Sequence, residues 1–189
     1  MPHGHSFTEF VGKKILIIGD VGAGKTKLTL ELISQAVEAG YAKDTTIIDM
    51  APATKLVKGK KIGGRLLEIM EMLEQLRYLT PIRVETPRLS AEDADHLLHL
   101  IKLNHDAILP LLQDFINKPS TVLFINDISI FLQSGSSEAV LSTIETSETF
   151  IANGYYGKYF AFDHDTGVSK TERDLMDLLA SKMDKVISI

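Results

Sequence analysis

One run of residues has types and spacing that suit phosphate chemistry. Gly19 is followed five positions later by Gly24, and Lys25 and Thr26 come directly after it. Glycines at this spacing let the backbone wrap so that its N–H groups point at phosphate oxygens, and a helix that begins here adds its positive dipole end. The lysine can neutralise phosphate charge, and the threonine hydroxyl is a ligand that Mg²⁺ accepts. The run therefore predicts a site for a polyphosphate with Mg²⁺.

The residues on either side of the run predict the elements that hold it. Residues 14–18 are an apolar run typical of a buried strand, and residues 25–38 place apolar side chains at helical spacing. A strand, a glycine-rich turn and an amphipathic helix in this order are the context that the motif requires. The residues expected to contact the phosphates are Asp20, Val21, Gly22, Ala23, Gly24, Lys25, Thr26 and Lys27.

Other apolar runs predict the remainder of a sheet. Besides residues 14–18, strands are expected at residues 45–50, 121–125, 158–162 and 185–189. Strands that are apolar on both faces and separated by helical segments are typical of parallel sheets covered by helices on both sides. The predicted fold class is therefore α/β, with a mostly parallel central sheet of about five strands and helices on both faces.

The chain is expected to form a single domain, residues 1–189, with a mostly helical insertion at about residues 53–118. Residues 66–79 have apolar side chains at helical spacing, and residues 90–93 are typical of a helix start. Pro110 is expected to split or kink the helix that follows. Residues 82–84, enclosed by prolines, suit either a short strand or an extended connector.

Two aspartates close predicted strands and are candidates for metal binding and catalysis. Asp127 follows the apolar residues 122–125 and Asn126, and a carboxylate there, like the Thr26 hydroxyl, is an oxygen ligand that Mg²⁺ accepts. Asp49 closes the second strand, at the edge where open α/β sheets collect ligands, and is the alternative general base. Lys25, Asp49 and Asp127 form the predicted catalytic set, and the sequence leaves open which aspartate is the main acid.

The motif and its context resemble the P-loop NTPase superfamily, most clearly over residues 14–40. The resemblance implies a Rossmannoid fold of the P-loop NTPase type, Walker A at residues 19–26, and Asp127 as the Walker B acid on a strand next to the P-loop strand. The segment around Asp49 is similar to the strand-Asp-x-x-Pro pattern of the SIMIBI branch. Asp20, however, stands where ATPases of that branch often carry an additional lysine.

This resemblance predicts Mg²⁺-dependent binding and hydrolysis of a nucleoside triphosphate by a molecular switch or assembly ATPase, with a protein partner and a homodimer left open. ATP is the default, because residues 181–184 are similar to a guanine motif but end a helix, and GTP stays open. One alternative is a small-molecule kinase with its acceptor site in residues 53–90 and Lys60, Lys61 or Arg65 in its lid. Another is a nucleotide-sensing module without turnover.

Composition excludes several other classes of protein. The chain has 20 Lys+Arg against 25 Asp+Glu, a formal net charge of −5, which disfavours general binding to nucleic acids or anionic membranes. Its apolar runs are far shorter than the roughly 20 residues that span a bilayer, and its first residues lack the features of a secretory signal. It has no cysteine, which excludes thiolate metal sites and disulfides and suits a reducing compartment. We expect a cytoplasmic protein.

Overall fold

The computed structural model describes residues 4–57, 60–70 and 76–189. The strands are β1 (Lys14–Gly19), β2 (Thr45–Asp49), β3 (Lys55–Val57), β4 (Lys60–Ile62), β5 (Arg77–Leu79), β6 (Val122–Asn126), β7 (Thr149–Tyr155) and β8 (Lys185–Ser188). The helices are α1 (Lys25–Glu38), α2 (Pro87–Ser90), α3 (Ala94–Asn117), α4 (Ser129–Leu132), α5 (Glu138–Thr146) and α6 (Val168–Ala180), and 3₁₀ turns lie at Phe7–Glu9, Ala42–Asp44 and Leu66–Glu68. Within the described ranges, each helix is too short or too polar to cross a bilayer.

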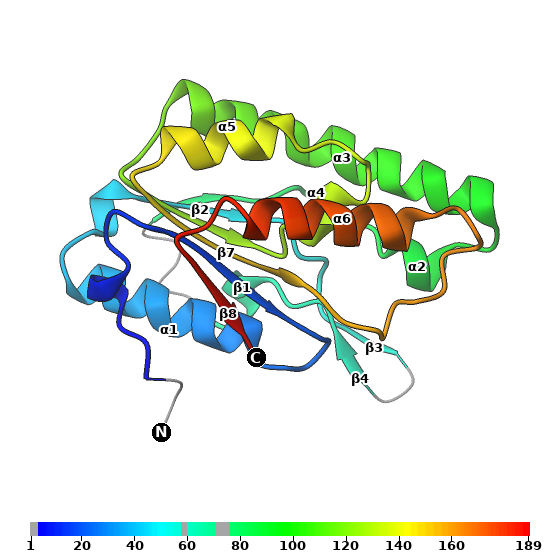
Figure 1. The fold of residues 1–189 in the computed structure, drawn as a ribbon, viewed down its shortest axis with the longest axis horizontal. Coiled ribbons are helices and arrows are strands. Elements are labelled where there is room, and N and C mark those ends of the chain that lie inside the picture. Colours follow the sequence, from blue (N-terminus) through cyan, green and yellow to red (C-terminus); the bar gives the residue numbers. More distant parts are fainter. Residues whose placement is uncertain (1–3, 58–59, 71–75) are drawn as a thin grey trace.

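The described strands form one six-stranded parallel sheet in the order β5-β2-β6-β7-β1-β8, with β3 and β4 paired separately as an antiparallel hairpin. Because all six strands run in the same direction, their carboxyl ends meet at one edge of the sheet. The β3–β4 hairpin lies beyond this edge, on the same side as the turn between β1 and α1 (Figure 1). The topology therefore brings segments that are distant in sequence together at the edge where parallel sheets bind ligands.

Helices cover both faces of the sheet, α1 on one and α3, α5 and α6 on the other (Figure 1). Side chains alternate between two cores along each central strand. On β1, Ile15 and Ile17 enter the core beneath α1, while Leu16 enters the opposite core. On β6, Phe124 and Leu123 divide in the same way. Burial on both faces explains the continuous apolar runs, and the predicted α/β class with a mostly parallel sheet is confirmed.

The predicted strand at residues 158–162 is wrong, because the fourth long strand is β7, Thr149–Tyr155. Asn153 and Gly154, residue types that are common in turns, lie inside this strand. Asn153 is buried, and its side chain forms hydrogen bonds with neighbouring polar side chains. Gly154 packs so closely that an added Cβ would lie 2.8 Å from Met176 Cε. Local polarity therefore concealed a strand whose non-apolar residues are satisfied by tertiary contacts.

Two helical predictions in residues 53–118 also fail. The region 66–79 is not one helix: it holds a 3₁₀ turn at Leu66–Glu68 and the strand β5, and residues 71–75 lie outside the described part. Pro110 does not interrupt α3, which continues from Ala94 to Asn117. Because proline has no N–H, the carbonyl of Asp106 has no helical hydrogen-bond partner. Pro110 and Asp106 both lie on the exposed side of the helix, so water can bond this carbonyl. The connector 82–84 is not a strand.

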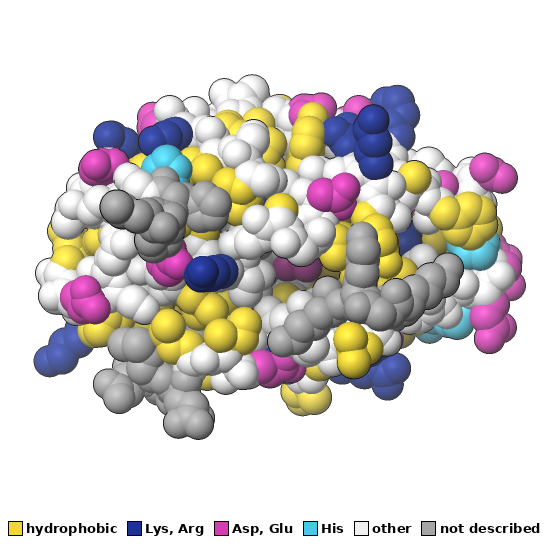
Figure 2. All heavy atoms as spheres, turned by 90° about the horizontal axis from the view of Figure 1, so that it is seen from below, with side chains coloured by type: hydrophobic (Ala, Val, Ile, Leu, Met, Phe, Trp, Pro, Cys, Tyr) yellow, Lys and Arg dark blue, Asp and Glu magenta, His cyan; other side chains and the backbone are white. Residues whose placement is uncertain are grey.

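The surface is mixed in charge on the face that carries α1. Basic and acidic side chains are interspersed there with small hydrophobic areas (Figure 2). Large hydrophobic side chains are more exposed near the carboxyl edge of the sheet, where Leu56 is 79% and Ile82 101% exposed. These two residues belong to the hairpin and to the connector before α2, the segments that border the candidate site.

Candidate nucleotide-binding site

The glycine-rich loop between β1 and α1 has a backbone that only glycine adopts easily. Gly22 and Gly24 have φ of 79° and 101°, in the left-handed region, and α1 begins immediately afterwards at Lys25. At Gly19 an added Cβ would lie 2.3 Å from the carbonyl oxygen of Ile189. The three glycines of the motif therefore have separate physical reasons: two permit the wrap of the loop, and one permits close packing beneath it.

Lys25 lies across this loop. Its Nζ donates hydrogen bonds to the carbonyl oxygens of Gly19, at 2.9 Å, and Asp20, at 2.8 Å. Burial lowers the pKa of Lys25, and the negative charges of Asp127 and Asp20 oppose that lowering. The ammonium group is thus removed from water and held by neutral carbonyls and nearby carboxylates, so a phosphate entering the loop would add a strong charge partner.

The side chain of Asp20 turns away from the loop interior. Its carboxylate accepts hydrogen bonds from the N–H groups of Val21, at 2.7 Å, and Lys158, at 3.1 Å. Burial alone would raise the pKa of Asp20, but these backbone bonds and the charge of Lys25 together lower it. Gly157 packs against this carboxylate, since an added Cβ would lie 2.3 Å from Asp20 Cγ. The loop after β7 therefore holds the Asp20 carboxylate away from the interior of the phosphate loop. Without these contacts, the motif would direct this negative charge at the phosphates.

Asp127 follows β6 and has an unusual backbone, with φ of 60°. Its N–H donates to Asn153 Oδ1 at 3.0 Å, and its carboxylate accepts from Ser129 Oγ at 2.9 Å. Burial raises the pKa of Asp127, and the positive charge of Lys25 is the main influence that opposes this rise. A carboxylate held in this way gains from a nearby cation, and the left-handed backbone is fixed by the bond from β7.

Two asparagines join the ends of three neighbouring strands. Asn153 Nδ2 donates to Asn126 Oδ1 and to Thr29 Oγ1, each at 2.8 Å, and Asn126 Nδ2 donates to Asp49 Oδ1 at 2.8 Å. Thr29 in turn donates to the carbonyl of Lys25 at 3.0 Å. The chain of bonds runs from β2 through β6 and β7 to the first turn of α1. Sequence analysis did not identify Asn153, whose partners lie far from it along the chain.

Asp49 is at the centre of a closed set of hydrogen bonds. Its side chain is 0% exposed and accepts from the N–H groups of Ala51, at 3.1 Å, and Leu66, at 2.7 Å, from Asn126, and from the Tyr78 hydroxyl. Burial raises the pKa of Asp49, while these donors act in the opposite direction. The geometry fastens the segment after β2 to the β3–β4 hairpin side of the site, and Asp49 does not line the cavity described next.

A cavity of about 130 Å³ opens at the carboxyl edge of the sheet. Its walls come from the loop before α1, the ends of β6 and β7, the glycines after β4, and α2. Lys25, Thr26 and Asp127 line it together with Gly63 and Arg88. Of the predicted phosphate-binding residues, those in the wall are Val21, Gly22, Lys25 and Thr26, and those outside it are Asp20, Ala23, Gly24 and Lys27.

The predicted basic lid has a different arrangement from a free cluster of cations. The side chains of Lys60 and Lys61 lie outside the described residues. Arg65 is fastened to backbone carbonyls, donating from Nη2 to Pro81, at 2.8 Å, and Ile82, at 3.2 Å. It connects the hairpin side of the cavity to the connector before α2.

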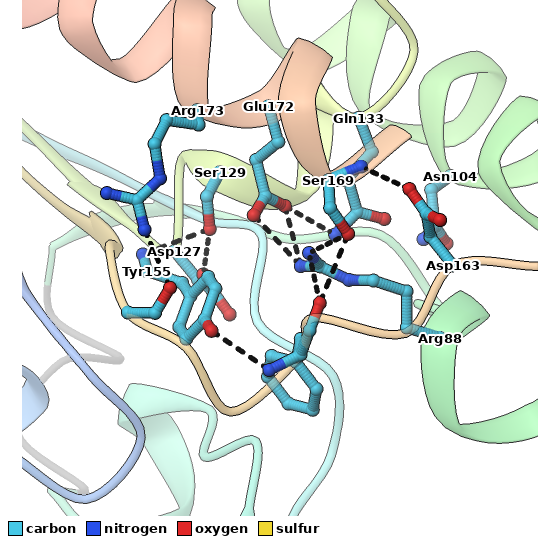
Figure 3. A network of polar contacts seen from close by, with 12 residues as sticks. Arg88, Asn104, Asp127, Ser129, Gln133, Tyr155, Asp163, Ser169, Glu172 and Arg173 are labelled. Carbon is cyan, nitrogen blue, oxygen red and sulfur yellow. Dashed lines mark hydrogen bonds and ion pairs between the residues drawn. The ribbon is translucent and has the colours of Figure 1, made fainter. Parts of the chain in front are cut away.

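A network of buried polar side chains joins Arg88 and Gln133, which line the cavity, to Glu172 on α6 (Figure 3). Arg88 Nη2 donates to both carboxylate oxygens of Glu172, at 2.9 and 2.8 Å, and Gln133 Nε2 donates to Glu172 Oε2 at 2.8 Å. The guanidinium of Arg88 also lies over the rings of Tyr155 and Phe160, 5.3 and 5.0 Å from their centroids. No local sequence pattern predicts this network, because Arg88 and Glu172 are 84 residues apart.

The residues present fit Mg²⁺ better than a metal held by protein ligands alone. The described residues contain no group of three or more His, Asp and Glu side chains that could hold a metal ion, and this includes the region of α3 that carries several histidines. Thr26 and Asp127 offer oxygen ligands on the same cavity. Mg²⁺ typically takes one or two protein oxygens and completes its shell with phosphates and water. The donor set therefore suits a cation that enters with a polyphosphate.

The parallel sheet and the glycine-rich loop between its β1 strand and α1 decide the fold. This α/β arrangement is the one that the resemblance to P-loop NTPases predicts. One expected detail is wrong: β7 lies between β1 and β6, so the strand that carries Asp127 is not next to the P-loop strand. Strand order depends on contacts between distant segments, which apolar runs do not encode. Asp49 lies one strand further away, on β2, and no closer family is identified.

Comparisons with known proteins add no functional argument. No protein-family model matches the chain, and no curated protein matches it. Among solved structures, the chain is similar to the flagellar accessory protein FlaH from Methanocaldococcus jannaschii, with 13% identity over 94% of this chain and 70% of FlaH and a TM-score of 0.48. It is also similar to the DnaC helicase loader, with 13% identity, coverage of 95% and 80%, and a TM-score of 0.43. For the Pif1 helicase from Candida albicans, identity is 16%, the chain spans 39% of that protein, and the TM-score is 0.36.

Proposed function

We propose that this protein binds a nucleoside triphosphate with Mg²⁺ and hydrolyses it slowly, acting as a molecular switch or assembly ATPase. ATP is the preferred substrate in this proposal, and GTP is the alternative. The observation that carries it is the placement of Lys25, Thr26 and Asp127 on one cavity beside a loop whose glycines adopt left-handed backbone. A protein partner and a second copy of the chain are compatible with a switch.

In this proposal the loop amides and Lys25 bind the phosphates, and the N-terminal end of α1 adds its dipole. Thr26 and Asp127 would hold Mg²⁺, which when bound neutralises phosphate charge that develops during transfer. Asn153 fixes the backbone of Asp127 through its hydrogen bond of 3.0 Å. Each of these contributions is binding or orientation, which accounts for most catalysis of phosphoryl transfer.

We expect slow turnover because the described cavity wall offers no carboxylate beyond the one assigned to the metal. Among the described residues that line the cavity, Asp127 is the one carboxylate, and the proposal assigns that side chain to the metal. Asp49, the alternative base, is enclosed by four donors, so we assign it a positioning role through Asn126. General base catalysis contributes about 10²- to 10⁴-fold in enzymes, and a site without a dedicated base lacks that factor.

One observation favours a second candidate, a small-molecule kinase. The region 53–90 supplies part of the wall of the cavity that the phosphate loop also lines, through residues 62–64 and 86–89. A phosphoryl acceptor held on that wall would face the outer end of a bound triphosphate. The acceptor site and lid predicted for residues 53–90 are compatible with this placement.

Calorimetry with Mg²⁺-ATP and Mg²⁺-GTP, followed by phosphate-release assays, tests the proposal. Binding with slow release in buffer alone supports a switch, whereas consumption that depends on an added metabolite such as a nucleoside or polyol supports the kinase. Binding without turnover supports a sensing module, and no binding by folded protein overturns the nucleotide assignment. We expect Lys25→Ala to weaken binding or turnover at least 10-fold, because the lysine is the loop's main charge partner.

Lys102→Ala is the matched control. Lys102 is also a lysine on a helix, but its side chain is 72% exposed and pairs with Asp106 on the surface. Its loss should leave nucleotide binding unchanged. Equal binding by the two variants would place the phosphate site elsewhere.

A further inference from the structure

A second cavity, of about 340 Å³, shares part of its wall with the first. The loop after β7 and the first half of α6 form most of this wall, and Arg88 on α2 completes it. Arg88, Tyr155 and Phe160 line both cavities. Within the described part of the chain, no residue of the phosphate loop, 19–27, lines the second cavity. It is therefore a separate place for a ligand, next to the candidate nucleotide site.

The charges on the second cavity do not cancel. Of the six charged side chains in its wall, four form two ion pairs, Arg88 with Glu172 and Lys170 with Asp174. The other two are Lys158 and Arg173, and neither has an ion pair among the described residues. The wall thus carries a surplus of two positive charges, although the whole chain has a formal net charge of −5. A concave surface with this surplus attracts an anion.

Arg173 is held in a position that leaves hydrogen-bonding capacity for such an anion. Its guanidinium lies over the ring of Tyr156, 4.0 Å from the centroid, and its Nη2 donates to the carbonyl of Gly157 at 2.7 Å (Figure 3). This is the one hydrogen bond of the Arg173 side chain among the described residues. A guanidinium presents two pairs of parallel N–H groups, one from Nε and Nη2 and one from Nη1 and Nη2. One bond from Nη2 engages one pair, so the other can bind a carboxylate or a phosphate with both of its N–H groups.

The rest of the wall offers aromatic surface. Tyr155, Tyr156 and Phe160 line the cavity, and the rings of Tyr155 and Phe160 pack edge to face with their centroids 5.1 Å apart. The N–H of Phe160 donates to the Tyr155 hydroxyl at 2.9 Å, which fixes this part of the loop. Apolar surface beside a few polar groups is the usual composition of a small-molecule site. The ligand that fits both features has a charged group attached to an apolar or aromatic body.

Arg88 provides a physical connection between the two cavities. Its Nη1 contacts the carbonyl of Phe160 at 3.3 Å and Ser169 Oγ at 3.5 Å, and both partners belong to the wall of the second cavity. These distances are near the upper limit for a hydrogen bond, so a ligand can alter these contacts at small cost. A shift of Arg88 or Phe160 changes the wall of the first cavity as well, because both residues line it.

We propose that the second cavity binds a small organic anion, a carboxylate or phosphate ester on an apolar or aromatic body, and that its occupancy is coupled to the nucleotide site. Arg173 and Lys158 bind the charged group, and the three aromatic side chains contact the body. The anion site stands without the function proposed above, whereas the coupling rests on that function.

NMR titrations of ¹⁵N-labelled protein test the site, with benzoate, phenyl phosphate and neutral benzyl alcohol as probes. We expect one or both anions to bind at least about 10-fold more tightly than the alcohol, because only the anions gain charge-assisted hydrogen bonds. Amide shifts should concentrate in residues 155–161 and 168–174, and the tighter anion identifies the preferred charged group. Equal affinity for all three probes, or shifts concentrated in residues 19–27, overturns the site.

Arg173→Gln should weaken the tighter anion about 10- to 100-fold and change the affinity for benzyl alcohol less than about twofold. Lys158→Gln should weaken the anion about two- to fivefold, because this side chain is exposed. The backbone N–H of Lys158, which holds Asp20, is kept in that variant, so it serves if Arg173→Gln unfolds. Arg83→Gln is the matched control, since the Arg83 side chain is 80% exposed and pairs with Glu85. Native anion affinity in folded Arg173→Gln, or in Lys158→Gln if the first variant unfolds, overturns the assignment.

A saturating non-hydrolysable ATP analogue with Mg²⁺ tests the coupling. We expect the analogue to change the affinity for the anion by at least about fivefold, and the anion to change the affinity for the analogue by the same factor. Unchanged affinities overturn the coupling. Failure of the native protein to bind the analogue overturns the proposed function, whereas the titrations without nucleotide decide on the anion site separately.

Discussion

Replacement of Asn153 by alanine is expected to destabilise the protein and to loosen Asp127 together. Asn153 is 2% exposed and makes three hydrogen bonds: it donates to Thr29 and Asn126 and accepts from the N–H of Asp127. Alanine removes all three bonds. It leaves the N–H of Asp127 without this acceptor at a residue whose left-handed backbone depends on it.

The magnitude follows from these bonds. A hydrogen bond contributes about 1 kcal/mol net, and a buried polar group left without a partner costs about 1–3 kcal/mol, so the free energy of unfolding should fall by roughly 3–5 kcal/mol. In a chain of this size each kcal/mol corresponds to about 2–4 °C, which gives a fall in Tm of roughly 6–20 °C. Mg²⁺-dependent nucleotide affinity should fall as well, because Asp127 is no longer held.

Thermal and urea unfolding measure the first effect, and calorimetry measures the second. Asn117→Ala is the control, because Asn117 is exposed at the end of α3. A Thr29→Val variant completes a double-mutant cycle with Asn153→Ala, where we expect a coupling of about 0.5–3 kcal/mol between bonded side chains. If Asn153→Ala is as stable as the control and binds nucleotide normally, the network described here does not support the site.

Three further predictions concern single residues. Asp127→Asn should raise the free energy of unfolding at pH 7, as measured by urea titration. Burial raises the folded-state pKa of Asp127, so the native protein loses stability as pH rises from the ordinary pKa to the raised one. The advantage of the variant should therefore shrink as pH falls toward about 4. The same variant should lose Mg²⁺-dependent binding in calorimetry, and a constant difference from pH 4 to 7 would contradict the assignment. Asp49→Asn should lower Tm without a change at the phosphate contacts, because an amide can accept only part of the four donated bonds; unchanged Tm would contradict its structural role. Gly157→Ala should displace the Asp20 carboxylate, whose Cγ would lie 2.3 Å from the new Cβ. The free energy of unfolding in urea should fall by about 1–2 kcal/mol. Unchanged stability would show that the contact between Gly157 and Asp20 contributes little.

The parts of the fold that local pattern determines were predicted well. Helix α1 has the predicted bounds, 25–38, because apolar periodicity and the preceding glycine act within that segment. Strands β1, β2 and β6 follow from short apolar runs buried on both faces, whereas β8, also predicted, is an edge strand in which Ile187 alone is buried. Strand β7 was misplaced because Asn153 and Gly154 suit a strand only when Asn126, Thr29 and Met176 pack against them. Strand order was likewise not local information.

The candidate site divides in the same way. Lys25 and Thr26 belong to one short motif, and Asp127 follows one apolar strand, so their types and spacing predict a shared site, and the three residues line one cavity. Arg88 stands alone in sequence, and its partner Glu172 lies on α6, 84 residues further on. Such a pair becomes visible only when the topology brings α2 and α6 together above the carboxyl edge.

The position of β7 in the middle of the sheet has a mechanical consequence. The loop that follows this strand holds Asp20 through the N–H of Lys158 and contacts Arg88 through the carbonyl of Phe160, while the strand itself anchors the backbone of Asp127. Strand β7 and the loop after it thus contact three separate points of the candidate site. A displacement of this segment would therefore change the surroundings of Asp20, Arg88 and Asp127 together.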